Sequence, residues 1–323
     1  MRRRGLLAAL AAAALVPTRA FTQVPPKMLR VGLAAIVPRT DPQWAALTKR
    51  MAEFGYEEGK NFALEFVQAK SFEDYPSVYA ELARRKVDIF VTIGGEPPVR
   101  AALAAAGSLP IVMLAVDFDP FEKGYVASLA RPGGNVTGLF VRQLELAAKR
   151  VELTREALPK AHVLGLWWDA TSRGQAEAAA TVARSLGFEP RLIEVTGQPP
   201  DYAGALGQMA DAPGEPIMIG AGGVFIRDRA AIMPLLLARR TPAIAPQREY
   251  VEAGALMSYG IDLVGLWRDI AGYVDRIAKG ANPADLPIEQ PTHFDMAVNL
   301  KTAASLGIAL PPLLTLRADE VIE

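Results

Sequence analysis

The sequence predicts an α/β protein built from two lobes, each with a parallel β-sheet. Short, continuously apolar segments alternate with helical segments, which is typical of parallel strands covered by helices on both faces. This alternation runs twice, and a turn rich in glycine and proline at 131–135 separates the two runs. The length of 323 residues also favours two lobes, because one core rarely serves more than about 250–300 residues.

The first run contains five expected strands and three expected helices. The strands lie at 28–37, 62–68, 87–93, 111–116 and 136–140, and the helices at 43–54, 75–85 and 99–106. The first helix shows the pattern most clearly, because Trp44, Leu47, Met51 and Phe54 fall on one face and Gly55 follows as a stop signal.

The second run repeats this order and is followed by a return of the chain. Strands are expected at 162–168, 191–195, 217–219 and 242–245, and helices at 143–158, 175–186 and 228–240. The return consists of a strand at 255–259, a long helix at 263–279, a proline-rich passage, a strand at 294–299 and a helix through 306. Such a return predicts more than one crossing between lobes. We place the first lobe at 28–138 plus about 260–285, and the second at 139–259 plus about 286–323.

The first twenty residues have the composition of an export signal. Arg2, Arg3 and Arg4 precede a small and apolar run at 6–16, and Ala20 offers a small-residue cleavage site. The run is shorter than the roughly 20 apolar residues that span a bilayer. We therefore expect a secretory signal peptide at 1–20 and a mature chain that begins near Phe21. A twin-arginine signal is a second interpretation of the same arginines.

Charge and cysteine usage narrow the classes of partner. The chain has 35 basic and 35 acidic residues, and loss of the four arginines in the signal leaves a net charge of about −4. This balance favours neither nucleic acid nor an anionic membrane surface as a partner. The absence of cysteine excludes disulfides, thiolate metal sites and a lipid-modified cysteine at the cleavage point. We expect a soluble periplasmic monomer whose mature chain does not insert into the membrane.

In open parallel sheets, ligands bind beyond the carboxyl ends of the strands. Two lobes with those ends facing each other form a cleft that can close on a small molecule. The candidate ligand-binding residues of the first lobe are Thr92, Gly94, Gly95, Glu96, Asp117 and Asp119. Glu96 either binds a cationic group of the ligand or stabilises the helix that begins beside it. Asp117 either binds ligand or caps the following turn.

The second lobe has its own candidates at equivalent positions. They are Trp168, Asp169, Thr171, Ser172, Phe225, Gln247 and Tyr250. Successive strand residues point to opposite faces, so only one of Trp167 and Trp168 can stack on a ligand. Thr171 or Ser172 either caps the next helix or joins its N-terminus in binding a carboxylate. The glycine-rich stretch 220–223 either cradles an anion or forms a tight turn.

The sequence contains no recognisable catalytic or metal-binding motif. Its only histidines, His162 and His293, lack metal-ligand or nucleophile-base spacing, and we interpret both as structural. We expect no metal, no cofactor and no enzymatic activity.

Four motifs carry a resemblance to a known family. They are SLARPGGNVTG at 128–138, LMSYG at 256–260, ADLPIEQP at 284–291 and ADEVIE at 318–323. With them the chain resembles the ABC transporter substrate-binding proteins, whose better-understood members bind aromatic amino acids such as tryptophan and phenylalanine. The resemblance implies a type I periplasmic binding fold, with two Rossmann-like lobes joined by three crossovers. It also implies delivery of a solute to a membrane permease that works with a cytoplasmic ATPase.

Two other functions share the predicted fold. An exported α/β enzyme would act on a small molecule through the candidate carboxylates, and turnover of a bound compound would reveal it. A sensory protein would report its ligand to a membrane receptor, and an uptake defect on deletion would argue against it.

Overall fold

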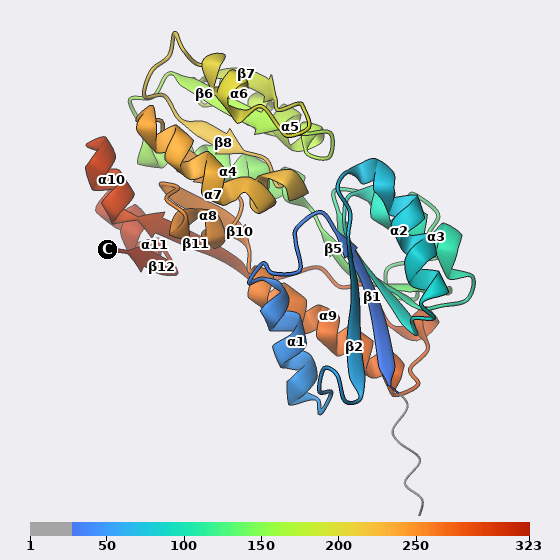
Figure 1. The fold of residues 1–323 in the computed structure, drawn as a ribbon. Coiled ribbons are helices and arrows are strands. Elements are labelled where there is room, and N and C mark those ends of the chain that lie inside the picture. Colours follow the sequence, from blue (N-terminus) through green and yellow to red (C-terminus); the bar gives the residue numbers. More distant parts are fainter. Residues whose placement is uncertain (1–27) are drawn as a thin grey trace, which may run out of the picture.

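The structure is a computed structural model that describes residues 28–323. The expected signal peptide and its cleavage site lie outside the described residues. Within 28–323, no helix combines the length and the apolarity that crossing a bilayer requires. The chain forms two lobes, each built on its own sheet (Figure 1), as the sequence predicts.

The sheet of the first lobe has five parallel strands in the order β2-β1-β3-β4-β5. Their bounds are Leu29–Ala35 (β1), Phe62–Gln68 (β2), Ile89–Gly94 (β3), Ile111–Val116 (β4) and Val136–Val141 (β5). Strand β1 lies between β2 and β3, and its apolar stretch 31–35 fits burial on both faces. The chain therefore runs outward from β1 to β2 and then returns past β1 to β3.

Helices cover both faces of this sheet. Helices α1 (Trp44–Glu53) and α9 (Leu263–Ala278) pack together on one face, and α2 (Tyr75–Arg84) and α3 (Glu96–Ala106) cover the other. Trp44 and Trp267 meet edge to face with ring centroids 4.7 Å apart. Figure 1 shows α9, from the last quarter of the chain, beside α1 from its beginning.

The second sheet repeats the topology of the first and extends it. Its order is β12-β11-β10-β9-β8-β6-β7. The bounds are Val163–Trp168 (β6), Glu189–Glu194 (β7), Ile217–Ile219 (β8), Ala243–Ala245 (β9), Met257–Ile261 (β10), Phe294–Asn299 (β11) and Glu320–Ile322 (β12). Strand β6 occupies the position of β1, between the strands that follow it. Strand β11 runs antiparallel to β10, and the other pairs are parallel.

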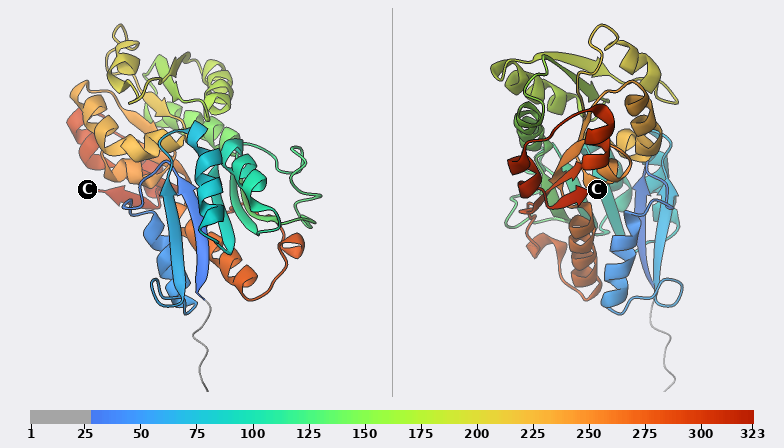
Figure 2. Two further views of the ribbon diagram at one scale, coloured as in Figure 1. Left: turned by 45° about the vertical axis from the view of Figure 1, so that its right-hand side comes forward. Right: turned by 90° about the vertical axis from the view of Figure 1, so that its left-hand side faces the viewer.

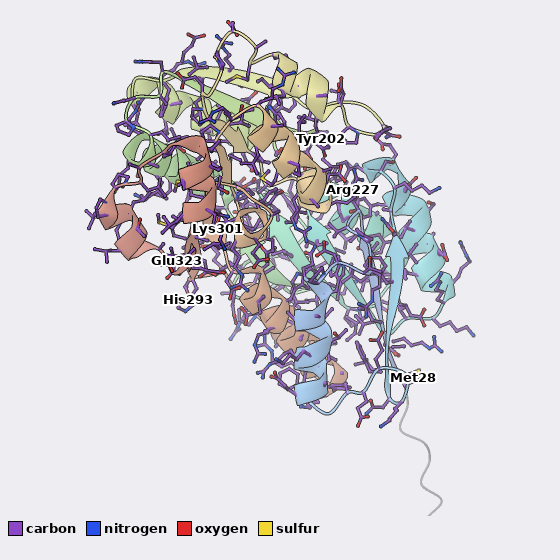
Figure 3. All side chains as sticks on the ribbon, turned by 60° about the vertical axis from the view of Figure 1, so that its left-hand side comes forward. Met28, Tyr202, Arg227, His293, Lys301 and Glu323 are labelled. Atoms are coloured by element: carbon purple, nitrogen blue, oxygen red, sulfur yellow. The ribbon has the colours of Figure 1, made fainter. Side chains whose placement is uncertain are left out.

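The second sheet is also covered on both faces (Figure 2). Helices α4 (Gln143–Ala157), α5 (Arg173–Ser185), α10 (Leu300–Leu306) and α11 (Pro312–Arg317) enclose one core, whereas α6 (Tyr202–Gly207), α7 (Gly223–Ala238) and α8 (Arg248–Glu252) enclose the other. Figure 3 shows that Lys301 and Glu323 belong to this lobe, and that Met28 lies at the far end of the first lobe.

Three segments connect the lobes: the step from β5 to α4, the step from β10 to α9, and the passage before β11. Strand β5 pairs with β4 up to Val141, three residues beyond the boundary expected at 138. The passage after α9 also stays with the first lobe beyond 285, because Leu139 and Glu289 form a β-bridge. Both differences arise from pairing that the sequence pattern does not show: β4 pairs with the end of β5, and β5 pairs with the passage at Glu289.

Several element bounds differ from the sequence predictions. Helix α7 begins at Gly223 rather than at 228, because the glycines after β8 start the helix directly. Helices α6, α8 and α11 and strand β12 are additional short elements. Each is five or six residues long, or three for β12, so none offers enough positions for a periodic pattern.

Gly138 allows β5 to lie against β4. It pairs with Met113 and has a φ of +132°, and a Cβ built on it would lie 2.1 Å from the Met113 carbonyl oxygen. Any larger residue must displace backbone there.

We therefore expect Gly138→Ala to lower the free energy of unfolding by about 3 kcal/mol, because overpacking and left-handed backbone each cost about 1–3 kcal/mol. The control is Gly134→Ala, where a Cβ meets nothing within 4 Å. Urea unfolding of both variants measures the difference. Equal stability of the two variants would contradict the packing described.

Candidate functional site

A cavity of about 110 Å³ lies between the two lobes. It is lined by residues at the ends of β1 and β3 in the first lobe, and by the loops after β6 and β8 in the second. In both sheets these are the strands at which the strand order reverses, which is where open α/β sheets bind ligands. The repeated topology thus brings two such positions face to face.

The wall contributed by the first lobe is apolar and aromatic. Its aromatic members are Trp44, Phe72 and Tyr75. Its aliphatic members include Ile36, Val37, Ile93, Leu114 and Val116. The indole Nε1 of Trp44 donates a 2.8 Å hydrogen bond to the Pro38 carbonyl, which fixes the ring at the start of α1. This wall offers a surface for an apolar or aromatic group.

The second lobe contributes a smaller and more polar wall. Its lining residues are Gln143, Thr171, Ala221, Gly222, Gly223 and Gln247, together with Ile226. The first lobe adds Gly94, Gly95 and Gln43. Among the residues that line the cavity in the described chain, none is Asp, Glu, Lys, Arg or His. Polar recognition therefore falls to side-chain amides, the hydroxyls of Thr171 and Tyr75, and the backbone.

Several helices begin at this cavity, but their first turns differ in how they are capped. The Asp262 carboxylate accepts hydrogen bonds from the first-turn amides of Val264 and Gly265 in α9. Helices α3 and α7 begin after Gly95 and Gly222, and no side chain caps either one. The first N–H groups of a helix lack intrahelical acceptors and carry partial positive charge. The cavity therefore contains donors suited to an anionic group.

Two sets of bonds hold the lobes together beside the cavity. Gln175 of α5 donates to the Asp117 carboxylate at 2.7 Å and accepts from the Ala221 amide at 2.8 Å. Arg229 of α7 forms a 2.8 Å ion pair with Asp41 of the first lobe, and the two side chains are 16% and 9% exposed. The Asp117–Gln175 and Asp41–Arg229 contacts join the two lobes directly.

Four of the residues predicted from the sequence line the cavity: Gly94, Gly95, Thr171 and Gln247. Gln247 is 9% exposed, and its Oε1 is buried without a hydrogen-bond partner in the described structure.

Four other predicted residues support the loops around the cavity. Asp169 Oδ1 accepts hydrogen bonds from the Thr171 amide and hydroxyl and from the Ser172 hydroxyl. Asp117 accepts from Gln175 and from the Leu144 amide, and burial raises the pKa of its carboxyl. Asp119 accepts from the Phe121 amide in the turn after β4. None of these side chains is among the lining residues of the cavity in the described chain, although Asp169 Oδ2 is buried without a hydrogen-bond partner there.

The remaining predicted residues are not among the lining residues of the cavity. Glu96 pairs with Lys123 at 2.8 Å and accepts from the Tyr125 hydroxyl at 2.6 Å, and these two partners lower its pKa. Thr92, Phe225 and Tyr250 are fully buried, and the two rings belong to the core of the second lobe. Trp168 packs at the edge of the opposite core, beneath the Arg173 guanidinium.

The aromatic wall and two of the three lining glutamines were missed by the sequence reasoning. The periodic pattern predicts only an apolar helix face for Trp44. Phe72 begins a one-turn 3-10 helix (Phe72–Asp74), and Tyr75 begins α2, so neither shows a signal of its own. The rule that ligands lie beyond strand ends, applied also to β1, points to Ile36, Val37 and the helix after them.

A buried arginine beneath the cavity was also missed. Arg150 of α4 is fully buried, and its Nη1 lies 3.4 Å from Gln143 Oε1 and 3.1 Å from the Tyr259 carbonyl. Burial lowers its pKa to about 10, and the Asp117 carboxylate opposes this effect. Arg150 therefore links Gln143, which lines the cavity, to the crossing strand β10.

The two histidines lie on the surface, and Figure 3 shows His293 at the edge of the second lobe. Within residues 28–323, no group of three or more histidine and carboxylate side chains is placed to hold a metal ion.

Comparisons with known proteins agree with this architecture. A "Tyrosine-binding protein" of Clostridioides difficile (strain R20291) is 24% identical over 292 residues, covering 87% of this chain and 82% of that protein. The ABC domain from Streptococcus pneumonia in complex with L-Trp has a TM-score of 0.78 at 23% identity, over 92% of this chain and all of that one. A conserved domain protein from Vibrio cholerae has a TM-score of 0.79 at 25% identity, over 91% of this chain and all of that one.

The sequence model of one family matches residues 32–322, nearly all of the described chain. The two-lobed fold, the cavity between the sheets and this match together identify the chain as a member of the ABC transporter substrate binding protein family.

Proposed function

We propose that this protein is the solute receptor of an importer. It captures an aromatic amino acid, or a related zwitterion or acid, between its closing lobes and delivers it to a membrane permease driven by an ATPase. The observation that carries this proposal is the cavity between the sheets, with an aromatic wall on one side and amide donors and acceptors on the other. The names of relatives that bind tyrosine and L-Trp support the same ligand class.

The mechanism is capture by closure rather than chemistry. The cavity lining contains no pair of groups able to act as nucleophile and base. Closure forms the Asp41–Arg229 pair and the Gln175–Asp117 hydrogen bond across the cleft. A ligand that contacts both walls favours the closed form by its differential affinity for that form. The closed form then presents surfaces of both lobes to the permease.

The cellular location belongs to the same proposal. We infer export through a signal peptide at 1–20, with cleavage near Ala20 and release as a monomer into the periplasm. The basic start, the short apolar run and the small residue at 20 support this inference.

Ligand class is tested by a thermal-shift screen of amino acids, aromatic acids and sugars. A ligand at 100 times its Kd adds about 2.7 kcal/mol, and each kcal/mol raises the Tm by roughly 2–4 °C for a chain of this size. We expect tryptophan, tyrosine or phenylalanine to raise the Tm by about 5–10 °C and to be recovered unchanged after incubation. A rise in Tm with sugars and none with amino acids would contradict the proposed ligand class.

The role of the Asp41–Arg229 pair is tested with Asp41→Asn, which keeps the side-chain shape and removes the charge. A hydrogen bond to a charged group contributes about 1.5–3 kcal/mol, so we expect the affinity for the ligand found in the screen to fall roughly 10–100-fold. Isothermal titration calorimetry measures the change. Asp211→Asn is the control, because Asp211 pairs with Arg191 within one lobe. Similar losses in both variants would show that the first pair does not assist closure.

A further inference from the structure

The polar groups of the second lobe's wall lie at the ends of two neighbouring strands. Strand β8 leads to Gly222 and Gly223 at the start of α7, and β9 leads to Gln247. The two strands pair directly, so their ends lie about 4.8 Å apart. The carboxylate and ammonium of an α-amino acid share one carbon, and the two groups fit within one strand spacing.

The side-chain oxygen of Gln247 lacks a hydrogen-bond donor in the described structure. Its Oε1 is buried, has no hydrogen-bond partner among residues 28–323, and belongs to a side chain that lines the cavity. A buried polar group without a partner costs about 1–3 kcal/mol. A donor supplied by the ligand removes this cost. Since no carboxylate lines the cavity of the described chain, this amide oxygen is well suited to accept from an ammonium group.

The start of α7 offers the complementary donors. The helix has sixteen residues, its N-cap is Gly222, and no side chain caps it. A Cβ at Gly223 would meet nothing within 4 Å, so the space beside its Cα is open, whereas a Cβ at Gly222 would meet the Asp169 carboxylate. Helix α3 faces the same cavity from the other lobe but begins Glu96-Pro97-Pro98, and proline has no N–H to donate. The carboxylate therefore belongs at α7.

We propose that Gln247 is the specificity-determining residue that accepts hydrogen bonds from the α-ammonium of the ligand, while the first amides of α7 bind its α-carboxylate. The pocket then selects α-amino acids over the corresponding acids and amides without any charged side chain. This inference rests on the proposed function of the same cavity and specifies how that cavity recognises the head group.

The test compares three probes by calorimetry: L-tryptophan, indole-3-propionate, which lacks the ammonium, and L-tryptophanamide, which lacks the carboxylate. We expect the wild-type protein to bind L-tryptophan at least about 10-fold more tightly than either analogue. Gln247→Leu should reduce the preference for L-tryptophan over indole-3-propionate about 10-fold or more, and should leave the preference over L-tryptophanamide unchanged. Gln247→Glu should increase the preference for L-tryptophan over indole-3-propionate.

The carboxylate contact is tested with Gly223→Pro. Proline is well tolerated at the first helical position, where it removes one N–H, and Gly222 already has the extended conformation that a following proline requires. We expect this variant to lose preference for L-tryptophan over L-tryptophanamide but not over indole-3-propionate. Thermal melts confirm that each variant is folded.

The matched control is Gln43→Leu. Gln43 also lines the cavity, but its side-chain nitrogen donates to Asp41 at 3.4 Å. This substitution should change the affinities for all three probes by the same factor. Equal wild-type affinity for L-tryptophan and indole-3-propionate would overturn the inference. A Gln247→Leu variant in which the affinities for L-tryptophan and indole-3-propionate fall by the same factor would also overturn it.

A second pair of probes separates this inference from the proposed ligand class. L-Leucine and 4-methylpentanoate differ by the same ammonium but carry no ring. If L-leucine and 4-methylpentanoate bind and the indole probes do not, the proposed aromatic ligand class is wrong. The ratio of the affinities for L-leucine and 4-methylpentanoate, measured in the wild type and in Gln247→Leu, still tests the role of Gln247. If no α-amino acid binds, both proposals are wrong.

Discussion

The site depends on one constraint, the parallel direction of the strands. Parallel strands all end at the same edge of a sheet, so the loops and helix starts that follow them gather there. Because β1 and β6 each lie between the two strands that follow them, the connections diverge on either side and leave a hollow. The cavity between the lobes is the meeting of two such hollows, and its lining comes mainly from strand ends and helix starts.

Neutrality is the main chemical property of this cavity. The carboxylates near it each have a partner in the protein: Asp117 pairs with Gln175, Asp169 Oδ1 with Thr171 and Glu96 with Lys123. Asp169 Oδ2 is buried without a hydrogen-bond partner among the described residues. These carboxylates shape the loops and hold the lobes rather than lining the cavity. A neutral lining avoids the cost of desolvating a fixed charge each time the cleft closes, and it leaves selectivity to the geometry of amides and helix ends.

Much of the fold could be predicted from the sequence, but less of the site. Parallel strands and their helices leave apolar runs and periodic patterns, so most elements and both lobes were identified. The loops at strand ends were also identified, and they supplied Gly94, Gly95, Thr171 and Gln247. Whether Glu96 or Asp117 faces a ligand depends on partners such as Lys123 and Gln175, which lie 27 and 58 residues away in the chain and leave no local pattern. For the same reason the sequence predicts only a core position for Trp44, although its side chain belongs to both the core and the cavity wall.

The packing of α9 against α1 also bears on how the chain is made. The core of the first lobe contains Trp44 and Trp267, so it combines residues separated by more than two thirds of the chain. During synthesis that core stays incomplete until α9 has left the ribosome, and contacts of such long range form slowly. The nascent first lobe therefore has no finished core for most of its translation.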